Sequence, residues 1–375
     1  MKIEFYRHNL TKEDKEACMN VLDSLFLTTG ETVKNFEAKF STYMNAKHTV
    51  ALTSCTAALH LALQYFNIGE GDEVITTPMT FIATANTIEY CGAKPVFVDV
   101  EAHTGNMDAD LLEKAITQRT KAIIPVHLYG QMCDMKKIKA IADKHNLKII
   151  EDAAHCVEGV RDGIKVGELS DMACYSFYAT KNLSCGEGGA ITCNDKDIHE
   201  WLMKARQHGM SKSAADRYSV RYQHYDMEFL GWKYNLSNIA ASLLVHQLDR
   251  LQEYLAQKEA IAQKFNNDFK SNKQLTIPEV LADSKHARHL YTIWVDPSKR
   301  DDYMNQLQEA GLGVAVNFRA LHLMSFYVQK YGYKKGDFPN SEAIGDATIT
   351  IPFYPKLSNE EIEYIIQSVN NVVKA

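Results

Sequence analysis

The chain has 375 residues, of which 46% are apolar and 23% charged, and its formal net charge is −6. This length exceeds that of one simple core, so two domains are the default expectation. The acidic balance and the lack of long basic runs argue against a nucleic-acid or anionic-membrane surface. The eight cysteines form no CxxC pair, and no apolar run resembles a signal-peptide core or a membrane span. We therefore expect a cytoplasmic protein with reduced cysteines and no metal site.

Two amphipathic helices are predicted at the start of the chain. The first is capped by Thr11 and carries an apolar stripe through Phe26. The second places four apolar residues on one side, namely Val33, Phe36, Phe40 and Met44. We interpret both helices as packing elements and assign them no chemistry.

From residue 49 onward, short β-rich runs alternate with helical segments. The β-rich runs are 49–52, 73–76, 95–100, 122–126 and 148–150, and the helical segments are 56–66, 81–90, 108–116 and 135–144. Strands that are apolar throughout and separated by helices predict a parallel sheet covered on both faces. Ligands of such sheets bind at the carboxyl ends of the strands.

Two of these strand ends carry residues suited to a ligand. Ser54, Thr56 and Ala57 lead directly into a helix, so hydroxyls, backbone N–H groups and the helix dipole there can form a phosphate cup. The alternative is an ordinary Ser/Thr cap. Phe81 follows the next strand and can lie flat against a planar ligand, or it can be a core residue at a helix start.

A third strand end carries the acidic pair Glu151 and Asp152, followed by His155. An acidic pair after an apolar strand is costly unless it meets a positive partner. Asp152 can pair with a protonated ring nitrogen, and the alternative is a solvated or salt-bridged strand end. His155 taken alone is a hydrogen-bonded structural histidine more often than a catalytic one.

The stretch 175–190, YSFYATKNLSCGEGGA, places Lys181 between two apolar runs. A lysine in that position cannot easily extend to water, and a desolvated amine becomes neutral, nucleophilic and able to form a Schiff base. The alternative is a surface lysine at a hairpin tip. The glycines at 186–189 do not form the GxGxxG fingerprint of a dinucleotide site.

Together the phosphate cup, Asp152 and Lys181 are the three kinds of group that bind pyridoxal 5′-phosphate (PLP). The phosphate docks on the helix N-terminus, the aspartate keeps the pyridine nitrogen protonated, and the lysine binds the aldehyde as an imine. Ser176 lies five residues before Lys181 and can offer its hydroxyl to the same phosphate.

A polar, tyrosine-rich stretch at 205–235 is long for a loop and suits a nucleotide diphosphate, with a solvated loop as the alternative. Its candidate residues are Arg217, Tyr218, Arg221, Tyr222, His224 and Tyr225. Beyond Ser237 the pattern changes to a helix reaching about residue 269, strands at 290–295 and 314–318, and helices at 301–310 and 359–373. We expect a large domain at 1–236 and a smaller α/β domain at 237–375.

Nearly the whole chain resembles the DegT/DnrJ/EryC1/StrS family of sugar aminotransferases, PLP enzymes of fold type I. The matching segments include LTTG at 27–30, SCTAALHLAL at 54–63, GDEVITTPMTFIATANTI at 71–88, EDAAH at 151–155, SFYATKNLSCGEGGAI at 176–191 and GWKYNLSNIAA at 231–241. The resemblance implies a mostly parallel, seven-stranded sheet covered by helices, beside a smaller C-terminal α/β domain.

The resemblance also implies a role for each cofactor-binding residue. Lys181 forms the imine and moves the proton, Asp152 pairs with the pyridinium nitrogen, and His155 lies near the ring. Phe81 stacks on the ring, and the phosphate is held by Ser54, Thr56, Ala57 and Ser176. Asn235 corresponds to an asparagine that reaches the phosphate from the neighbouring subunit, which makes the working unit a homodimer with shared sites.

The activity implied is amino transfer from L-glutamate to a nucleotide-linked 4-keto-6-deoxy sugar. LTTG at 27–30 favours amination at C4 over C3. The substrate-side residues expected are Thr29, Asn182, Tyr222, Arg319 and His322. Some family members carry histidine in place of the lysine and act as sugar dehydratases, so Lys181 favours transamination. A catalytically silent binding protein is a third alternative, against which the intact lysine, aspartate and phosphate cup argue.

Overall fold

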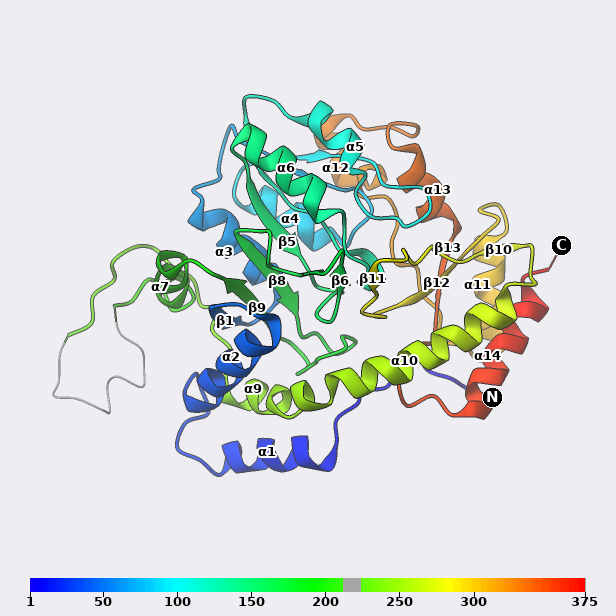
Figure 1. Cartoon of the computed structure of the whole chain (residues 1–375), viewed down its shortest axis with the longest axis horizontal. Helices are drawn as coiled ribbons and strands as arrows, with labels where there is room; N and C mark the ends of the chain where they lie inside the picture. Colours follow the sequence, from blue (N-terminus) through cyan, green and yellow to red (C-terminus); the bar gives the residue numbers. More distant parts are fainter. Residues whose placement is uncertain (212–223, 375) are drawn as a thin grey trace.

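The computed structural model describes residues 1–211 and 224–374. A seven-stranded sheet with strand order β1-β9-β8-β5-β4-β2-β3 lies at its centre (Figure 1). Its strands are β1 (His48–Leu52), β2 (Glu73–Thr76), β3 (Lys94–Phe97), β4 (Thr120–Ile123), β5 (Lys148–Asp152), β8 (Met172–Ser176) and β9 (Gly189–Cys193). Strand β9 runs antiparallel to both of its neighbours, β1 and β8, and every other pair of neighbouring strands in this sheet is parallel. The prediction of a mostly parallel, seven-stranded sheet is confirmed.

Helices cover both faces of this sheet, because the strand side chains alternate between two apolar cores. One core lies between the sheet and α2 (Glu31–Met44), α6 (Met135–His145), α9 (Asn238–Val245) and the first turns of α10 (Gln247–Phe269). The other lies beneath α3 (Cys55–Tyr65), α4 (Ile82–Tyr90) and α7 (Lys196–Ala205). Helix α1 (Lys12–Leu22) packs on α9, and the predicted helix at 108–116 is a short α5 (Ala109–Leu112) followed by η1 (Glu113–Ala115).

A further core forms around a three-stranded sheet of β10 (Leu275–Thr276), β12 (Tyr291–Val295) and β13 (Thr348–Ile351). The far half of α10, α11 (Arg300–Glu309) and α14 (Asn359–Val372) enclose it. Ile3 is fully buried in the same core, and its backbone exchanges hydrogen bonds with Gly311 and Gly313. The division of the chain at residue 236 stays a prediction.

The predicted strand at 314–318 does not form. Only Ala315 bridges to Thr350 of β13, and the chain then turns so that Asn317 and Phe318 line a cavity. The remaining elements are a small sheet of β6 (Val160–Arg161), β7 (Ile164–Lys165) and β11 (Ser284–Lys285), helices α12 (Ser325–Tyr331) and α13 (Pro339–Ala347), and the turns η2 (Leu128–Gly130) and η3 (Leu321–Leu323). No helix in the described part of the chain is both long and apolar enough to cross a bilayer.

A cluster of four aromatic rings joins α2 to the end of β8. Tyr175 and Phe177 point to the same side of the strand and meet Phe36 and Phe40 edge-on, at centroid separations of 5.0–5.5 Å. Edge-to-face pairs of this kind add to the free energy of ordinary apolar burial. The alternating aromatics before Lys181 therefore anchor the segment from which that lysine projects.

Truncating this cluster should destabilise the protein. Phe40 is fully buried, so Phe40→Ala should lower the free energy of unfolding by about 3–5 kcal/mol through lost burial and the cavity left behind. Urea denaturation followed by circular dichroism measures the change. Phe326→Ala is the control, because that ring is 52% exposed on α12 and its loss should cost less than about 1 kcal/mol. Equal midpoints for the two variants would contradict the anchoring role.

Candidate active site

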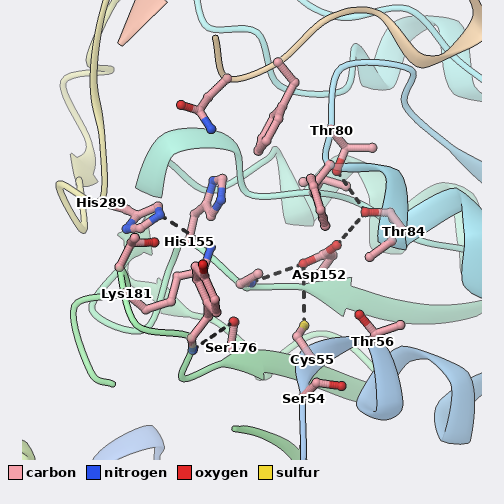
Figure 2. Close-up of a pocket in the computed structure, with 18 of the residues that line it drawn as sticks. Ser54, Cys55, Thr56, Thr80, Thr84, Asp152, His155, Ser176, Lys181 and His289 are labelled. Carbon is pink, nitrogen blue, oxygen red and sulfur yellow. Dashed lines mark hydrogen bonds between the residues drawn. The ribbon is translucent and has the colours of Figure 1, made fainter. Parts of the chain in front are cut away.

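A cavity of about 500 Å³ opens at the carboxyl ends of the parallel strands. Residues that follow β1 and β2, and the last residues of β5 and β8, all contribute to its wall. Figure 2 shows the polar side chains of the wall, among them Thr56, Asp152, Ser176 and Lys181, gathered from these different strands. The predicted convergence of the strand ends is therefore observed.

The predicted phosphate cup lies at the start of α3. Ser54 is the N-cap of this helix, and its Oγ accepts a hydrogen bond from Ala57 N at 3.0 Å. Ser54, Thr56 and Ser176 line the cavity, whereas Ala57 is buried and its backbone N–H is engaged by the Ser54 cap. Gly189 of β9 lies directly against the loop, because a Cβ added there would stand 2.3 Å from the carbonyl carbon of Ser54. Hydroxyls and the positive end of the helix dipole thus face the cavity together.

Asp152 is held in a fixed orientation at the end of β5. Its Oδ2 accepts a 2.7 Å hydrogen bond from Thr84 Oγ1, and its Oδ1 accepts one from Ala154 N at 3.1 Å. Burial raises the pKa of Asp152, while the hydrogen bonds from Thr84 and Ala154 and the charge of Lys181 oppose this shift. A buried carboxylate with these partners can still accept a hydrogen bond from a cationic ring.

Lys181 projects into the cavity from the turn after β8. Its Nζ lies 3.4 Å from His289 Nε2 (Figure 2). Burial lowers the pKa of Lys181 to about 8, and the charges of Cys55 and Asp152 act in the opposite direction. At neutral pH a useful fraction of this amine is therefore unprotonated and nucleophilic.

Two histidines flank Lys181, and burial lowers the pKa of each well below the ordinary value, with the charge of Lys181 adding to the effect. His155 was predicted from the sequence, and its ring lies 4.4 Å from that of His289 and stacks on Phe318 at 5.8 Å. His289 was missed. It comes from the segment before β12, more than a hundred residues after Lys181, and no local motif marks it.

Phe81 lines the cavity beside Phe318, with ring centroids 5.9 Å apart. Its side chain is 55% exposed, so it is not a core residue at a helix start. A face of this ring is available to a planar ligand, and its stacking role stays a prediction.

Several predicted substrate residues do not reach the cavity. The amide of Asn182 is engaged with Glu158, Ala287 and Lys258. His322 is fully buried, where its Nε2 lies 3.0 Å from Glu342 Oε1. Arg319 is exposed and lies outside the cavity wall.

Thr29 and Asn235 also lie outside this cavity. They contact each other, since Asn235 Nδ2 donates a hydrogen bond to Thr29 Oγ1 at 2.6 Å. The contact brings LTTG at 27–30 against the segment KYNLS at 233–237. Tyr222, Arg217, Tyr218 and Arg221 fall outside the described residues.

The residues present fit pyridoxal phosphate. A helix N-terminus with two flanking hydroxyls suits its phosphate, the oriented carboxylate of Asp152 suits its ring nitrogen, and the desolvated amine of Lys181 suits its aldehyde. Among residues 1–211 and 224–374, no group of three or more His, Cys, Asp or Glu side chains is arranged to hold a metal ion.

Comparison with known proteins agrees with this fit. Residues 8–370 match the DegT/DnrJ/EryC1/StrS aminotransferase family. The spore coat polysaccharide biosynthesis protein SpsC of Bacillus subtilis is 42% identical over 369 residues, covering 97% of this chain and 95% of that protein. GDP-perosamine synthase of Caulobacter vibrioides is 35% identical, covering 97% and 96%. The PLP form of Spr1654 from Streptococcus pneumoniae superposes with a TM-score of 0.92 at 31% identity, covering 100% of this chain and 99% of that one.

The family match spans the cavity wall from the phosphate cup to the residues after β12, and Phe5 is the one described wall residue that precedes it. The chain therefore belongs to the DegT/DnrJ/EryC1/StrS aminotransferase family, whose enzymes are PLP-dependent sugar aminotransferases.

Proposed function

We propose that this protein transfers an amino group from L-glutamate to C4 of a nucleotide-linked 4-keto-6-deoxy sugar, in the synthesis of a glycan. The observation that carries the proposal is the desolvated amine of Lys181 in one cavity with Asp152 and the phosphate cup. The names of two relatives support the substrate class, since one makes a GDP-linked sugar and the other serves polysaccharide synthesis. The LTTG segment supports C4.

The geometry supports a division of labour among these residues. Bound pyridoxal phosphate supplies an electron sink for the carbon that gains or loses the amino group. The start of α3, with Ser54, Thr56 and Ser176, binds the phosphate and fixes the position of the ring. Asp152, oriented by Thr84, keeps the ring nitrogen protonated. Lys181 carries the proton between the reacting carbons, and the buried wall around it limits access of water.

Two other activities are alternatives to this one. Amination at C3 uses the same cavity residues, and only the position of the sugar distinguishes it. A sugar dehydratase requires that the cofactor is not held by a lysine, and Lys181 is present. Incubation with L-glutamate and UDP-, dTDP- and GDP-linked keto sugars, followed by product mass and NMR, separates the three, because amination adds nitrogen while dehydration removes water.

We also propose that the active unit is a homodimer with shared sites. Asn235 lies outside the cavity of its own chain, and Leu25, Met227 and Leu230 carry exposed apolar side chains. Such side chains become buried where two copies meet. Asn235 would then reach the phosphate of the partner.

Removing the amine tests the chemistry. Lys181→Ala should eliminate the visible absorbance of the bound cofactor and lower turnover by roughly a thousandfold or more, because both the imine-forming group and the proton carrier are lost. Lys196→Ala is the control, since Lys196 is a solvent-exposed lysine on α7. Turnover of Lys181→Ala near the wild-type rate would rule out the proposed mechanism.

The pH dependence of cofactor capture follows from the lowered pKa of Lys181. Only the unprotonated amine attacks the aldehyde, so the capture rate should rise with pH and level off above about 8. Stopped-flow absorbance between pH 6 and 11 measures the midpoint. Because the charge of Asp152 raises the pKa of Lys181, Asp152→Asn should move the midpoint to lower pH. A midpoint near the ordinary lysine pKa would contradict the desolvated amine.

The shared site can be tested by mixing two inactive variants. Lys181→Ala lacks the amine, and Asn235→Asp opposes the phosphate with a negative charge. A mixed dimer contains one site with Lys181 of one subunit and Asn235 of the other, so random mixing should restore about a quarter of the wild-type activity. Activity after subunit exchange is the measurement. If each chain completes its own site, mixing restores none.

A further inference from the structure

A buried polar cluster behind the cavity wall joins α10 to both segments that meet at the Lys181 amine. Lys258 of α10 is 5% exposed. Its Nζ donates one hydrogen bond to Asn182 Oδ1 at 2.9 Å and another to the carbonyl of His289 at 3.1 Å. Asn182 is the residue after Lys181, and His289 is the residue whose ring contacts the Lys181 amine. The Lys258 ammonium group therefore hydrogen-bonds to both Asn182 and His289, the two residues that adjoin the Lys181 amine.

Asn182 also connects Lys258 to the buried acid Glu158. Its Nδ2 donates to Glu158 Oε1 at 2.9 Å and to the carbonyl of Ala287 at 2.6 Å. Glu158 is 4% exposed. The amide thus bridges the two buried charges of Glu158 and Lys258, and each charge is compensated through it.

Two further sets of hydrogen bonds restrain the segment 287–289. Glu259, next to Lys258, accepts hydrogen bonds from Arg288 Nε and a terminal guanidinium nitrogen at 2.7 and 3.1 Å. On the opposite side, Ala287 N and His289 N donate to the carbonyls of Gly130 and Tyr129. Gly130 has φ +114°, and a Cβ there would lie 3.0 Å from Arg288 N. This close approach leaves His289 little freedom to move relative to Lys181.

Removal of any one member would leave a charge or an amide buried without its partner, which is costly. Burial disfavours the charged forms of both Glu158 and Lys258, raising the pKa of the acid and lowering that of the amine. The other titratable groups that act electrostatically on Lys258 are Arg288, His286 and His289. Those that act on Lys181 are Cys55, Asp152, His155 and His289. A buried cluster of this kind costs stability, and its hydrogen bonds fix the position of the groups that it contacts, here the two residues beside the Lys181 amine.

We propose that Lys258 and Glu158, acting through Asn182, are positioning residues that set the location and hydration of the Lys181 amine. This inference rests on the proposed role of Lys181. Loss of the Lys258 ammonium releases Asn182 and the carbonyl of His289 together. Water then reaches Nζ, the protonated amine becomes easier to form, and the amine loses its alignment with the reacting carbon.

The test uses Lys258→Met in the cofactor-loaded enzyme. We expect kcat to fall roughly tenfold to a hundredfold with KM for both substrates changed less than about threefold, because alignment is lost and binding is not. In a second measurement, on enzyme stripped of cofactor, we expect the pH midpoint of pyridoxal phosphate capture to rise by roughly half a unit or more, because hydration favours the protonated Lys181 amine. The control is Lys264→Met on the same helix, whose partner is Glu363 at the surface, and it should behave as wild type.

A second variant separates positioning from folding. Lys258→Met combined with Glu158→Gln removes both charges and leaves neither partner as an unbalanced buried ion, so it should fold even if the single variant is too unstable to measure. It still lacks the ammonium that holds Asn182 and His289, so the raised midpoint and the lowered kcat should persist. A double variant with the wild-type midpoint and kcat would overturn the inference. A wild-type protein that takes up no pyridoxal phosphate would instead overturn the proposed function, and the inference with it.

Discussion

Desolvation of one amine is the constraint on which the rest of this structure depends. Lys181 is useful only if its amine is kept from water, and burial is the largest cause of its lowered pKa. The chain satisfies this requirement with segments from distant parts of the sequence. β8 and the aromatic cluster fix where the lysine emerges, while the segment before β12 places His289 against its Nζ. A lysine on a freely moving hairpin tip would keep the ordinary pKa of an exposed amine.

The single antiparallel strand is a consequence of the same requirement. β9 returns along β8 after the turn that carries Lys181, and Gly189 pairs with both Ser176 and Leu52. The strand therefore brings the lysine turn, the end of β8 and the phosphate cup into one place. A parallel crossover after Lys181 would have to leave the carboxyl edge of the sheet and could not make this contact.

Much of this arrangement could be predicted from the sequence, because its signals are local. Apolar runs separated by helices predict the parallel sheet, and Ser54, Asp152 and Lys181 each stand at a strand end or within a few residues of one. What could not be predicted depends on contacts between distant segments. His289 is separated from Lys181 by 108 positions, and no spacing rule links them. Asn182 looked available because it follows the lysine, yet its amide is taken up by Lys258 and Glu158. His322 was expected on the substrate side from the family resemblance, and its ring is buried against Glu342. The predicted strand at 314–318 failed because that segment turns toward the cavity after one bridge.

The burial of Ile3 has a consequence for the order in which the protein forms during synthesis. Ile3 lies in one core with Ile365, Ile366 and Val369 of α14 and with Tyr291 of β12. Ile3 is made long before α14, so it must wait for that helix before it finds all of its partners. The large sheet is complete once β9 has emerged, with α9 and α10 still to cover one face. The core around β12 is completed only when α14 has been made, so the final step of folding joins the two ends of the described chain.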